Sequence, residues 1–280
     1  MKNKKIIALT LIIGLALFAV IGCGGNQASS GGGQSSDVVK LVVGATPEPH
    51  AEILTQAKEL LKAKGIELEI KEFTDYTTPN IALSDGSLDA NFFQHVPYLE
   101  EFSQQNNLDL TWTTAVHFEP LGLYSYKIKD LSELKDGDRI AVPNDTTNEA
   151  RALWLLQDNG IITLKDGVGL TATVTDIVEY KVKVEIVELE APQLPRALED
   201  VTAAVINGNY AIGAGLNPAK DALVMEDPSS MAADTFKNVV AVRVGDENRP
   251  EIKALDEVLN SPEIKKFIED KYQGAVVPVF

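Results

Sequence analysis

The chain has 280 residues, of which 45% are hydrophobic and 24% are charged, a composition typical of a globular protein. Its 41 acidic and 25 basic residues give a net charge of −16. Nucleic-acid binding needs a basic surface that neutralises phosphates, and none is evident beyond the first five residues, so the composition argues against nucleic acid as a partner. The same acidic excess argues against a polybasic domain that binds a membrane surface.

The first 22 residues have the pattern of a secretory signal peptide. Lys2, Lys4 and Lys5 precede residues 6–22, which carry no charge. This apolar run is at the short limit for a membrane-spanning helix, and its basic start and the small residue at its end are typical of a processed segment. We therefore predict a signal peptide over residues 1–22.

Cys23 is the only cysteine of the chain and follows this segment directly. It cannot form a disulfide within the chain, and the sequence VIGC at 20–23 resembles a bacterial lipobox, in which the cysteine is lipidated and becomes the first residue of the mature chain. The alternative is a buried thiol, but a polar Gly/Ser tract follows. We predict a lipid anchor at Cys23, which holds the protein outside the cytoplasm on the bacterial cell membrane.

A flexible tether is predicted over residues 23–37. It contains the sequence GGNQASSGGGQSS, which has no apolar periodicity. A Gly/Ser-rich coil of this length spans roughly 20 Å on average. Removal of the signal peptide leaves 22 basic and 41 acidic residues, a net charge of −19 for the mature chain.

The remaining residues alternate between short apolar runs and stretches with helical periodicity, a pattern that predicts an α/β fold. The first series consists of strand 40–45, helix 51–64, strand 66–70, helix 80–84, strand 88–92, helix 98–106 and strand 111–116. The second consists of strand 139–143, helix 147–159, strands 184–189 and 203–206, a strand after Asn238, and helices within 251–272 that break at Ser261 and Pro262. We predict two lobes, one formed by 38–121 plus 239–280 and the other by 122–238.

The sequence lacks the common motifs of enzymes. It contains no GxGxxG, Walker loop, HExxH, CxxC or GxSxG. His50, His95 and His117 have no close partner at a spacing typical of metal sites. We therefore predict a protein that is not an enzyme and that uses no cofactor and no metal.

The segment TDYTTPNIALSDGSLDANFFQHVPYLE is rich in aromatic residues for a chain with 6% aromatic content. Phe93 and His95 share one face if their stretch is extended, and Tyr98 follows at the start of a helix. Together with Tyr76 they predict an aromatic wall. The alternative is that these rings belong to the core, which we expect for Phe92 on the opposite face; His95 is then a core histidine with satisfied hydrogen bonds.

The segment VPNDTTNEARALWLLQDN predicts a strand that leads through a polar turn into a helix. Asn148 and Arg151 are three residues apart in the first turn, so they project from one face beside the free N–H groups of the helix start. Arginine offers a fork that matches a carboxylate, and Asn148 adds a donor. The alternative is an arginine on a solvated surface.

Several ordered blocks resemble the NlpA/MetQ family of lipoproteins, the methionine-binding components of ABC importers. They are VGATPEPHAEIL, the aromatic segment above, IAVPNDTTNEARALWLLQDNGII, VELEAPQLPRAL, AVINGNYA and GLNPAKDAL. The resemblance covers nearly the whole mature body. It implies a type II-like periplasmic-binding-protein fold whose two lobes close over a free amino acid in the cleft between them.

The resemblance also implies the roles of eight side chains. The thioether of the ligand would lie among Tyr76, Phe93, His95 and Tyr98. Its α-carboxylate would be held by Asn148 and Arg151. Two further polar ligands would be Asn207 in AVINGNY and Asn238 in FKNVVAVR. The chain departs from the family in Glu48, which stands where many members have glycine, and in the segment DPSSMAADTFKN before Asn238, which is longer than in close relatives.

We therefore predict a lipid-anchored substrate-binding protein that captures L-methionine, or else D-methionine or a methionine dipeptide. It would deliver this ligand to a membrane permease with a cytoplasmic ATPase. One alternative is a surface lipoprotein with a role in adhesion or interaction and a vestigial cleft. Another is an extracytoplasmic hydrolase, for which no nucleophile motif is found.

Overall fold

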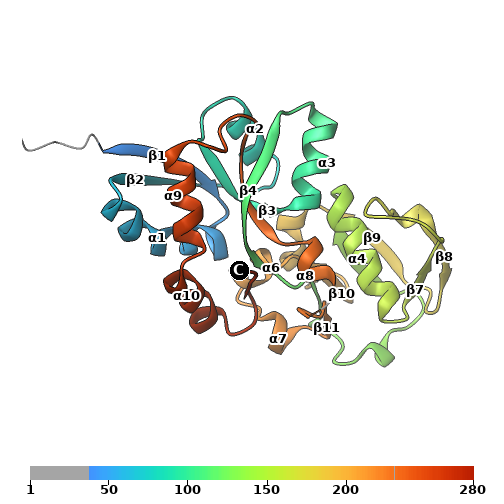
Figure 1. Ribbon diagram of the computed structural model, residues 1–280. Helices are drawn as coiled ribbons and strands as arrows, with labels where there is room; N and C mark the ends of the chain where they lie inside the picture. The colour runs from blue at the N-terminus through green and yellow to red at the C-terminus, as the bar shows by residue number, and fades with distance from the viewer. Residues whose placement is uncertain (1–37, 230) are drawn as a thin grey trace, which may run out of the picture. The chain divides into compact units, whose positions relative to one another are not determined.

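The structure is a computed structural model that describes residues 38–229 and 231–280. The predicted signal peptide, Cys23 and the tether lie outside this range. The described chain is a mixed α/β protein, which confirms the predicted fold class. Its strands form a six-stranded sheet, a five-stranded sheet and a small hairpin (Figure 1).

The six-stranded sheet, called the first sheet, has the order β13-β4-β12-β3-β1-β2. Its strands are β1 (Val39–Ala45), β2 (Ile66–Glu72), β3 (Ala90–His95), β4 (Leu110–Phe118), β12 (Asn238–Arg243) and β13 (Val277–Pro278). β1 runs parallel to β2 and β3, whereas β12 lies antiparallel between β3 and β4. The sheet thus joins the first and last parts of the body.

Helices cover both faces of the first sheet. They are the π-helical turn Pro47–Ala51, α1 (Glu52–Ala63), α2 (Thr78–Ser84), α3 (Val96–Asn106), α9 (Pro250–Leu259) and α10 (Pro262–Tyr272). Ile53 of α1, Leu255 of α9 and Ile264 of α10 are fully buried in one core with Leu41 and Val43 of β1. The C-terminal helices therefore pack on the strand that begins the body.

The five-stranded sheet, called the second sheet, has the order β11-β5-β10-β6-β9. Its strands are β5 (Gly122–Tyr124), β6 (Arg139–Pro143), β9 (Glu185–Leu189), β10 (Ala203–Ile206) and β11 (Val224–Met225). The helices around it are α4 (Thr146–Asp158), α5 (Leu194–Ala197), α6 (Gly208–Gly213) and α7 (Pro218–Asp221). The hairpin pairs β7 (Ile162–Leu164) with β8 (Ile177–Tyr180), and short 3-10 turns cover Leu131–Glu133, Val174–Asp176 and Ala191–Gln193.

Several predicted helix boundaries agree with the caps found, although α2 and α3 each begin two residues before their predicted start. Asp145 caps α4, because its side chain accepts a hydrogen bond from the backbone N–H of Asn148. Ser261 caps α10 in the same way and accepts from the backbone N–H of Ile264. Gly65 and Gly160 follow α1 and α4 with φ angles of +78° and +69°, which glycine adopts without strain.

The strand predicted at 88–92 is displaced in the structure, where β3 covers Ala90–His95. Leu88 precedes the strand, although its side chain is buried in the core. The last residues of the strand are polar, which hid their strand character. Asn91 and Gln94 are nevertheless buried, because they bond to each other and to Asn80 of α2.

The chain crosses between the sheets twice. It leaves the first sheet after Phe118, at the end of β4, and enters the second at Gly122. It returns between Met225 and Asn238, a stretch that contains α8 (Met231–Thr235). Glu119 of the first crossing and Asn238, which follows the second, line the cavity described below.

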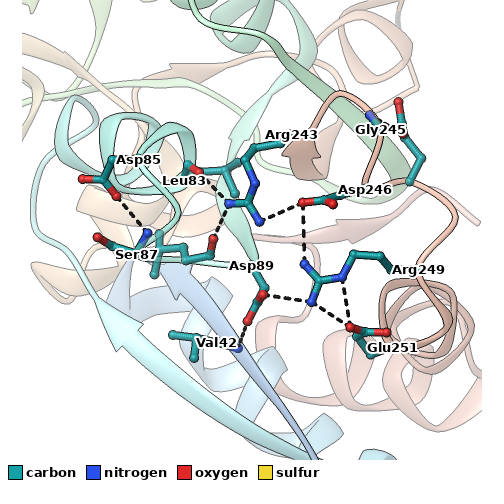
Figure 2. Close-up of polar contacts among 12 residues, drawn as sticks. Val42, Leu83, Asp85, Ser87, Asp89, Arg243, Gly245, Asp246, Arg249 and Glu251 are labelled. Atoms are coloured by element: carbon teal, nitrogen blue, oxygen red, sulfur yellow. Dashed lines mark hydrogen bonds and ion pairs between the residues drawn. The ribbon is translucent and has the colours of Figure 1, made fainter.

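An ion-pair network joins the end of β12, the start of α9 and the loop before β3 (Figure 2). The Arg243 guanidinium donates to the backbone carbonyls of Leu83 and Leu88, at 2.7 and 2.6 Å. Arg249 donates to Asp89 at 2.9 Å. These bonds hold the returning chain against the first sheet.

Candidate ligand-binding site

A cavity is lined by residues from elements of both sheets. Its empty space, including its opening, is about 350 Å³. The lining residues are Tyr76, Phe93, Gln94, His95, Tyr98, Glu119, Asn148, Arg151, Asn207, Gly208, Asn209 and Asn238. The structure therefore brings all eight residues of the sequence-predicted ligand site to one place.

Aromatic rings form one part of this cavity. The Tyr76 ring centroid lies 5.9 Å from that of Phe93 and 5.7 Å from that of Tyr98. The Tyr98 hydroxyl donates to the Tyr76 backbone carbonyl at 3.1 Å, which fixes one ring against the other. Phe92 lies in the core behind β3, as its position on the opposite face predicts. The rings thus present an apolar surface of fixed shape to the cavity.

His95 connects the aromatic part to the polar part. Its Nδ1 accepts the backbone N–H of Tyr98 at 3.1 Å and so caps α3. The proton of the neutral ring therefore lies on Nε2, which donates to Asn148 Oδ1 at 3.1 Å. Burial, followed by the nearby Arg151 charge, lowers the pKa of His95 to about 3. His95 is thus a neutral donor that helps to orient Asn148.

The amide of Asn148 is fully engaged within the protein. Its Nδ2 donates to Asp145 Oδ1 at 2.9 Å, and its Oδ1 accepts from His95 and from Asn207 Nδ2, the latter at 2.9 Å. The sequence suggested a free donor at this position. In the structure the side chain instead links α4 to the residues around it.

Arg151 already has a carboxylate partner. Its Nε and Nη2 donate to the two oxygens of Glu226, at 2.7 Å for Nε, and Nη2 also donates to the Glu119 carbonyl at 2.8 Å. The side chains of Arg151 and Glu226 are only 4% and 10% exposed. The Phe236 ring centroid lies 4.4 Å from the guanidinium carbon. Arg151 is therefore no solvated surface arginine, and Glu226 is a neighbour that the sequence did not reveal.

The two remaining residues predicted to bind the ligand lie at the ends of secondary-structure elements. Asn207 precedes α6, and its Oδ1 is buried without a hydrogen-bond partner. Asn238 begins β12 and pairs with His95 on β3 and with His117 on β4. Its Oδ1 accepts from His50 Nε2 at 3.1 Å. Asn238 thus lies at the cavity.

Glu119, at the first crossing, is a cavity residue that sequence reasoning missed. Its Oε1 lies 2.8 Å from His117 Nε2 and 3.3 Å from His50 Nε2. A Cβ on Gly208 would approach the Glu119 Cβ to 2.8 Å, so only glycine fits beside it. The short sequence HFE holds His117 and Glu119, but only the fold adds His50.

Hydrogen bonds engage most polar atoms of this buried cluster, although His117 Nδ1 is buried without a hydrogen-bond partner. His50 Nε2 faces two acceptors and therefore carries the proton, so its Nδ1 accepts from Thr46 Oγ1 at 2.7 Å. Burial lowers the pKa of His50 to about 4 and that of His117 to about 3. The ligand atoms of His50, His117 and Glu119 lie within 4.8 Å of one another, a composition compatible with a metal ion. Two of these atoms already have hydrogen-bond partners: His117 Nε2 bonds Glu119 Oε1, and His50 Nε2 bonds Asn238 Oδ1.

Comparisons with known proteins identify the family of the chain. Residues 41–280 match the NlpA lipoprotein family. The chain is 41% identical to the methionine-binding lipoprotein MetQ of Bacillus subtilis, covering 100% of this chain and 99% of that protein. It is 39% identical to the D-methionine-binding lipoprotein MetQ of Escherichia coli, covering 99% of this chain and 98% of that protein.

Solved structures show the same fold. A nutrient-binding protein from Burkholderia cenocepacia, bound to methionine, superimposes with a TM-score of 0.82 and 43% identity, covering 86% of this chain and 100% of that one. A lipoprotein from Ruminococcus gnavus superimposes with a TM-score of 0.85 and 53% identity, covering 86% of this chain and 99% of that one. Within residues 38–229 and 231–280, every helix is too short or too polar to cross a membrane.

Proposed function

We propose a function on the premise that the chain belongs to the NlpA lipoprotein family. On this proposal it is the lipid-anchored, extracytoplasmic substrate-binding protein of an ABC importer, and its ligand is methionine. The observation that supports this proposal is the cavity, which joins an aromatic wall to a buried arginine and several amides. Such a site matches a small molecule with an apolar end and a charged end. The protein would bind and deliver its ligand without chemical change.

The aromatic part suits a thioether. Tyr76, Phe93 and Tyr98 stand with their ring centroids 5.7 to 6.1 Å apart. A polarisable sulfur gains roughly 0.3 to 1.5 kcal/mol from each contact with an aromatic ring. This contribution favours methionine over leucine, which has a similar size but no sulfur.

The polar part suits a carboxylate. Arg151 uses Nε and Nη2 for Glu226 and the Glu119 carbonyl, so we assign its third nitrogen, Nη1, to the ligand. Asn238 offers its Nδ2, since its Oδ1 is held by His50. A bond from a charged donor is roughly twice as strong as one between neutral groups, which makes Arg151 the main anchor.

We further propose that the two sheets belong to two lobes, with 38–121 plus 239–280 in one and 122–238 in the other. The two crossings, at 119–121 and 226–237, would act as hinges. Glu119 and Glu226 lie in these crossings, and both contact Arg151. Closure over methionine would create the surface that a membrane permease and its ATPase recognise.

Calorimetry with the mature body tests the ligand. L-Methionine, D-methionine, glycyl-methionine and leucine would be titrated, after mass spectrometry of the purified protein for retained ligand. We expect the methionine compounds to bind and leucine to bind at least tenfold more weakly. Failure of all three methionine compounds to bind would contradict the proposed function.

The lipid anchor is tested separately by Cys23→Ala. We expect the variant to move from the membrane fraction to the soluble fraction, because the thiol that carries the lipid is gone. Affinity for methionine should stay unchanged, since the cavity is lined entirely by residues of the body. Fractionation in high salt is the measurement; retention on membranes would contradict the anchor.

A further inference from the structure

Three side chains of the kinds that bind metal ions meet beside the cavity. His50 comes from the turn before α1, His117 from β4, and Glu119 from the first crossing. Glu119 Oε1 lies 2.8 Å from His117 Nε2 and 3.3 Å from His50 Nε2. One ligand atom from each side chain lies within 4.8 Å of the other two, and all three residues are buried. Three segments of the chain thus converge on one point.

Two imidazoles and one carboxylate are a set of ligands that suits zinc. Proteins hold Zn²⁺ with ligand atoms at about 2.0 to 2.2 Å, and zinc sites made of two histidines and a glutamate leave a fourth position to water. Two atoms bound to one tetrahedral zinc ion therefore stand about 3.3 Å apart. His50 Nε2 and Glu119 Oε1 already have this separation. The contact between His117 and Glu119 is shorter and would lengthen by about 0.5 Å to admit the ion.

The hydrogen bonds of the two histidines can rearrange to admit a metal ion. Each neutral ring carries its proton on Nε2, whereas a ring that binds a metal through Nε2 carries the proton on Nδ1. His50 Nδ1 would then donate to Thr46 Oγ1, at 2.7 Å, because a hydroxyl oxygen also accepts. His117 Nδ1 is buried without a hydrogen-bond partner, so a proton placed there breaks no existing bond. Beyond the three ligands, the change therefore reaches only Thr46 and Asn238, whose Oδ1 loses the bond from His50.

Charge and access also favour a cation at this point. Glu119 and Asn238 line the cavity, which offers a metal ion and its bound water a path to the buried imidazoles. Arg151 bonds the backbone carbonyl of Glu119, and its own charge is offset by Glu226. The mature chain has a net charge of −19, so its overall field attracts cations.

We propose that His50, His117 and Glu119 form a binding site for one divalent transition-metal ion, and that Zn²⁺ is the ion this site fits best. The ion ties the turn before α1 and the end of β4 to the first crossing, and it stabilises the folded chain. This inference goes beyond the proposed function, because it concerns a second ligand and does not depend on methionine. It also differs from the expectation of a protein without a metal, which rested on the spacing of the histidines along the chain.

The first test measures zinc binding in the absence of methionine. It uses the mature chain with Cys23→Ala, because Cys23 is the only thiol and would itself bind zinc. The protein would be purified without a histidine tag, dialysed against a chelator and titrated with Zn²⁺ by calorimetry. We expect one zinc ion per chain. An excess of Ca²⁺, which prefers oxygen ligands, should occupy the acidic surface without displacing that zinc ion.

The second test assigns the ion to the three residues. His117→Gln and Glu119→Gln each remove one zinc ligand and leave a side chain of similar size. Loss of a group that merely orients a zinc ligand lowers metal affinity about 10- to 100-fold, so we expect the loss of a ligand to cost at least about 100-fold. Glu149→Gln is the matched control, because it removes a buried carboxylate that bonds the backbone of Val174. It should bind zinc as the parent protein does.

Melting curves provide a second measurement. Zinc should raise the melting temperature of the parent protein and of Glu149→Gln, because a ligand that binds only the folded chain stabilises it. The same zinc concentration should leave His117→Gln and Glu119→Gln unchanged. A parent protein that binds no zinc would overturn the inference. Zinc binding that survives in either of these two variants would overturn it as well, because the ion would then lie elsewhere on the chain.

A titration with Co²⁺ decides the question if His117→Gln and Glu119→Gln do not fold. Cobalt held by two imidazoles and a carboxylate in a tetrahedral site absorbs visible light strongly, whereas cobalt on surface carboxylates is octahedral and absorbs weakly. We expect the strong band in the parent protein, and its absence would contradict the site. Methionine enters none of these measurements, so they remain valid even if the proposed function fails.

Discussion

Two arginines of this protein make the same kind of bond in different surroundings. Arg151 is paired with Glu226 beside the cavity, and its side chain is 4% exposed. Arg249 is paired with Asp89 and Glu251 near the surface, and its side chain is 28% exposed (Figure 2). A buried charge is costly to leave unpaired, whereas a hydrated one loses little when its partner is removed. The two pairs should therefore respond very differently to the same substitution.

The surroundings also differ in what the bonds connect. Arg151 bonds Glu226 at one crossing and the Glu119 carbonyl at the other, so its position depends on both connections between the sheets. Arg249 joins the start of α9 to Asp89 just before β3, within the elements of the first sheet. The first pair thus lies beside the cavity proposed to bind the ligand, whereas the second holds the returning chain.

The largest effect is expected for Arg151→Ala. The substitution removes the proposed carboxylate anchor and leaves Glu226 buried without its cation. We expect methionine affinity to fall by about 2 to 5 kcal/mol, which is roughly 30-fold to several thousand-fold. Calorimetry is the measurement, and wild-type affinity in the variant would remove Arg151 from the site.

Glu226→Gln separates ligand binding from local folding. It leaves Arg151 with its full charge and a partner of the same size, so methionine should bind as tightly as in the wild type or tighter. If instead Glu226→Gln loses as much affinity as Arg151→Ala, the loss reports damage to the crossing and not a lost carboxylate contact.

A second effect concerns the pH dependence of stability. His117 has a pKa of about 3 in the folded chain, against 6.5 when exposed. Between these values the unfolded chain binds a proton that the folded chain does not, so this contribution to stability is lost as the pH falls below about 6.5. Replacing His117 with Gln removes this pH-dependent contribution to stability. The difference in unfolding free energy between wild type and variant should shrink by about 3 kcal/mol from pH 6.5 to pH 4.

Glu149→Gln serves as a control, because its effect on stability should depend on pH in the opposite direction. Burial raises the pKa of Glu149 to about 7, so protonation on acidification relieves a buried charge in the folded chain. The cost of that charge is present above pH 7 and disappears toward pH 4.5. Glu149→Gln should therefore gain stability relative to the wild type at high pH and lose that gain at low pH. Urea unfolding at several pH values measures both variants, and parallel curves for His117→Gln would refute a neutral buried histidine.

Asn238→Ala should reduce the stabilisation that methionine confers. A ligand at about 100 times its dissociation constant stabilises the folded state by roughly 2.7 kcal/mol. If loss of the amide weakens binding about tenfold, the same concentration gives roughly 1.4 kcal/mol. The ligand-induced rise in melting temperature should fall accordingly. Asn106→Ala, on the exposed part of α3, serves as the control, and an equal rise in both variants would place Asn238 outside the site.

Local patterns predicted the parts of the site that lie on one element or one segment. Asn148 and Arg151 lie three residues apart in the first two turns of α4, and Phe93 and His95 share β3, so spacing alone put each pair together. The family resemblance added Asn207 and Asn238. The strongest partner of Arg151, Glu226, comes from a segment far along the chain, and only the second crossing brings it close.

The same limit explains the missed histidine cluster. His50 lies before α1 and His117 at the end of β4, and the sequence spacing of the two suggested no relation. They meet because β12 lies between β3 and β4, which places Asn238 beside both. The hairpin of β7 and β8 escaped prediction for a different reason: Val178 and Tyr180 are exposed, so the strand lacks a buried face to mark it.

The smallest effect is expected for Arg249→Ala. Its partners Asp89 and Glu251 are 24% and 16% exposed, so water can replace much of what the guanidinium provides. Exposed ion pairs contribute about 0.2 to 1 kcal/mol each, and we expect a total loss of about 1 kcal/mol in unfolding free energy. The loss should diminish in high salt, because mobile ions screen such pairs. Lys266→Ala, which removes a more exposed pair with Asp270, should have no measurable effect. Methionine affinity should be unchanged in both variants. A loss from Arg249→Ala as large as that of breaking a buried pair, or a change in affinity, would mean that this network is coupled to the cavity after all.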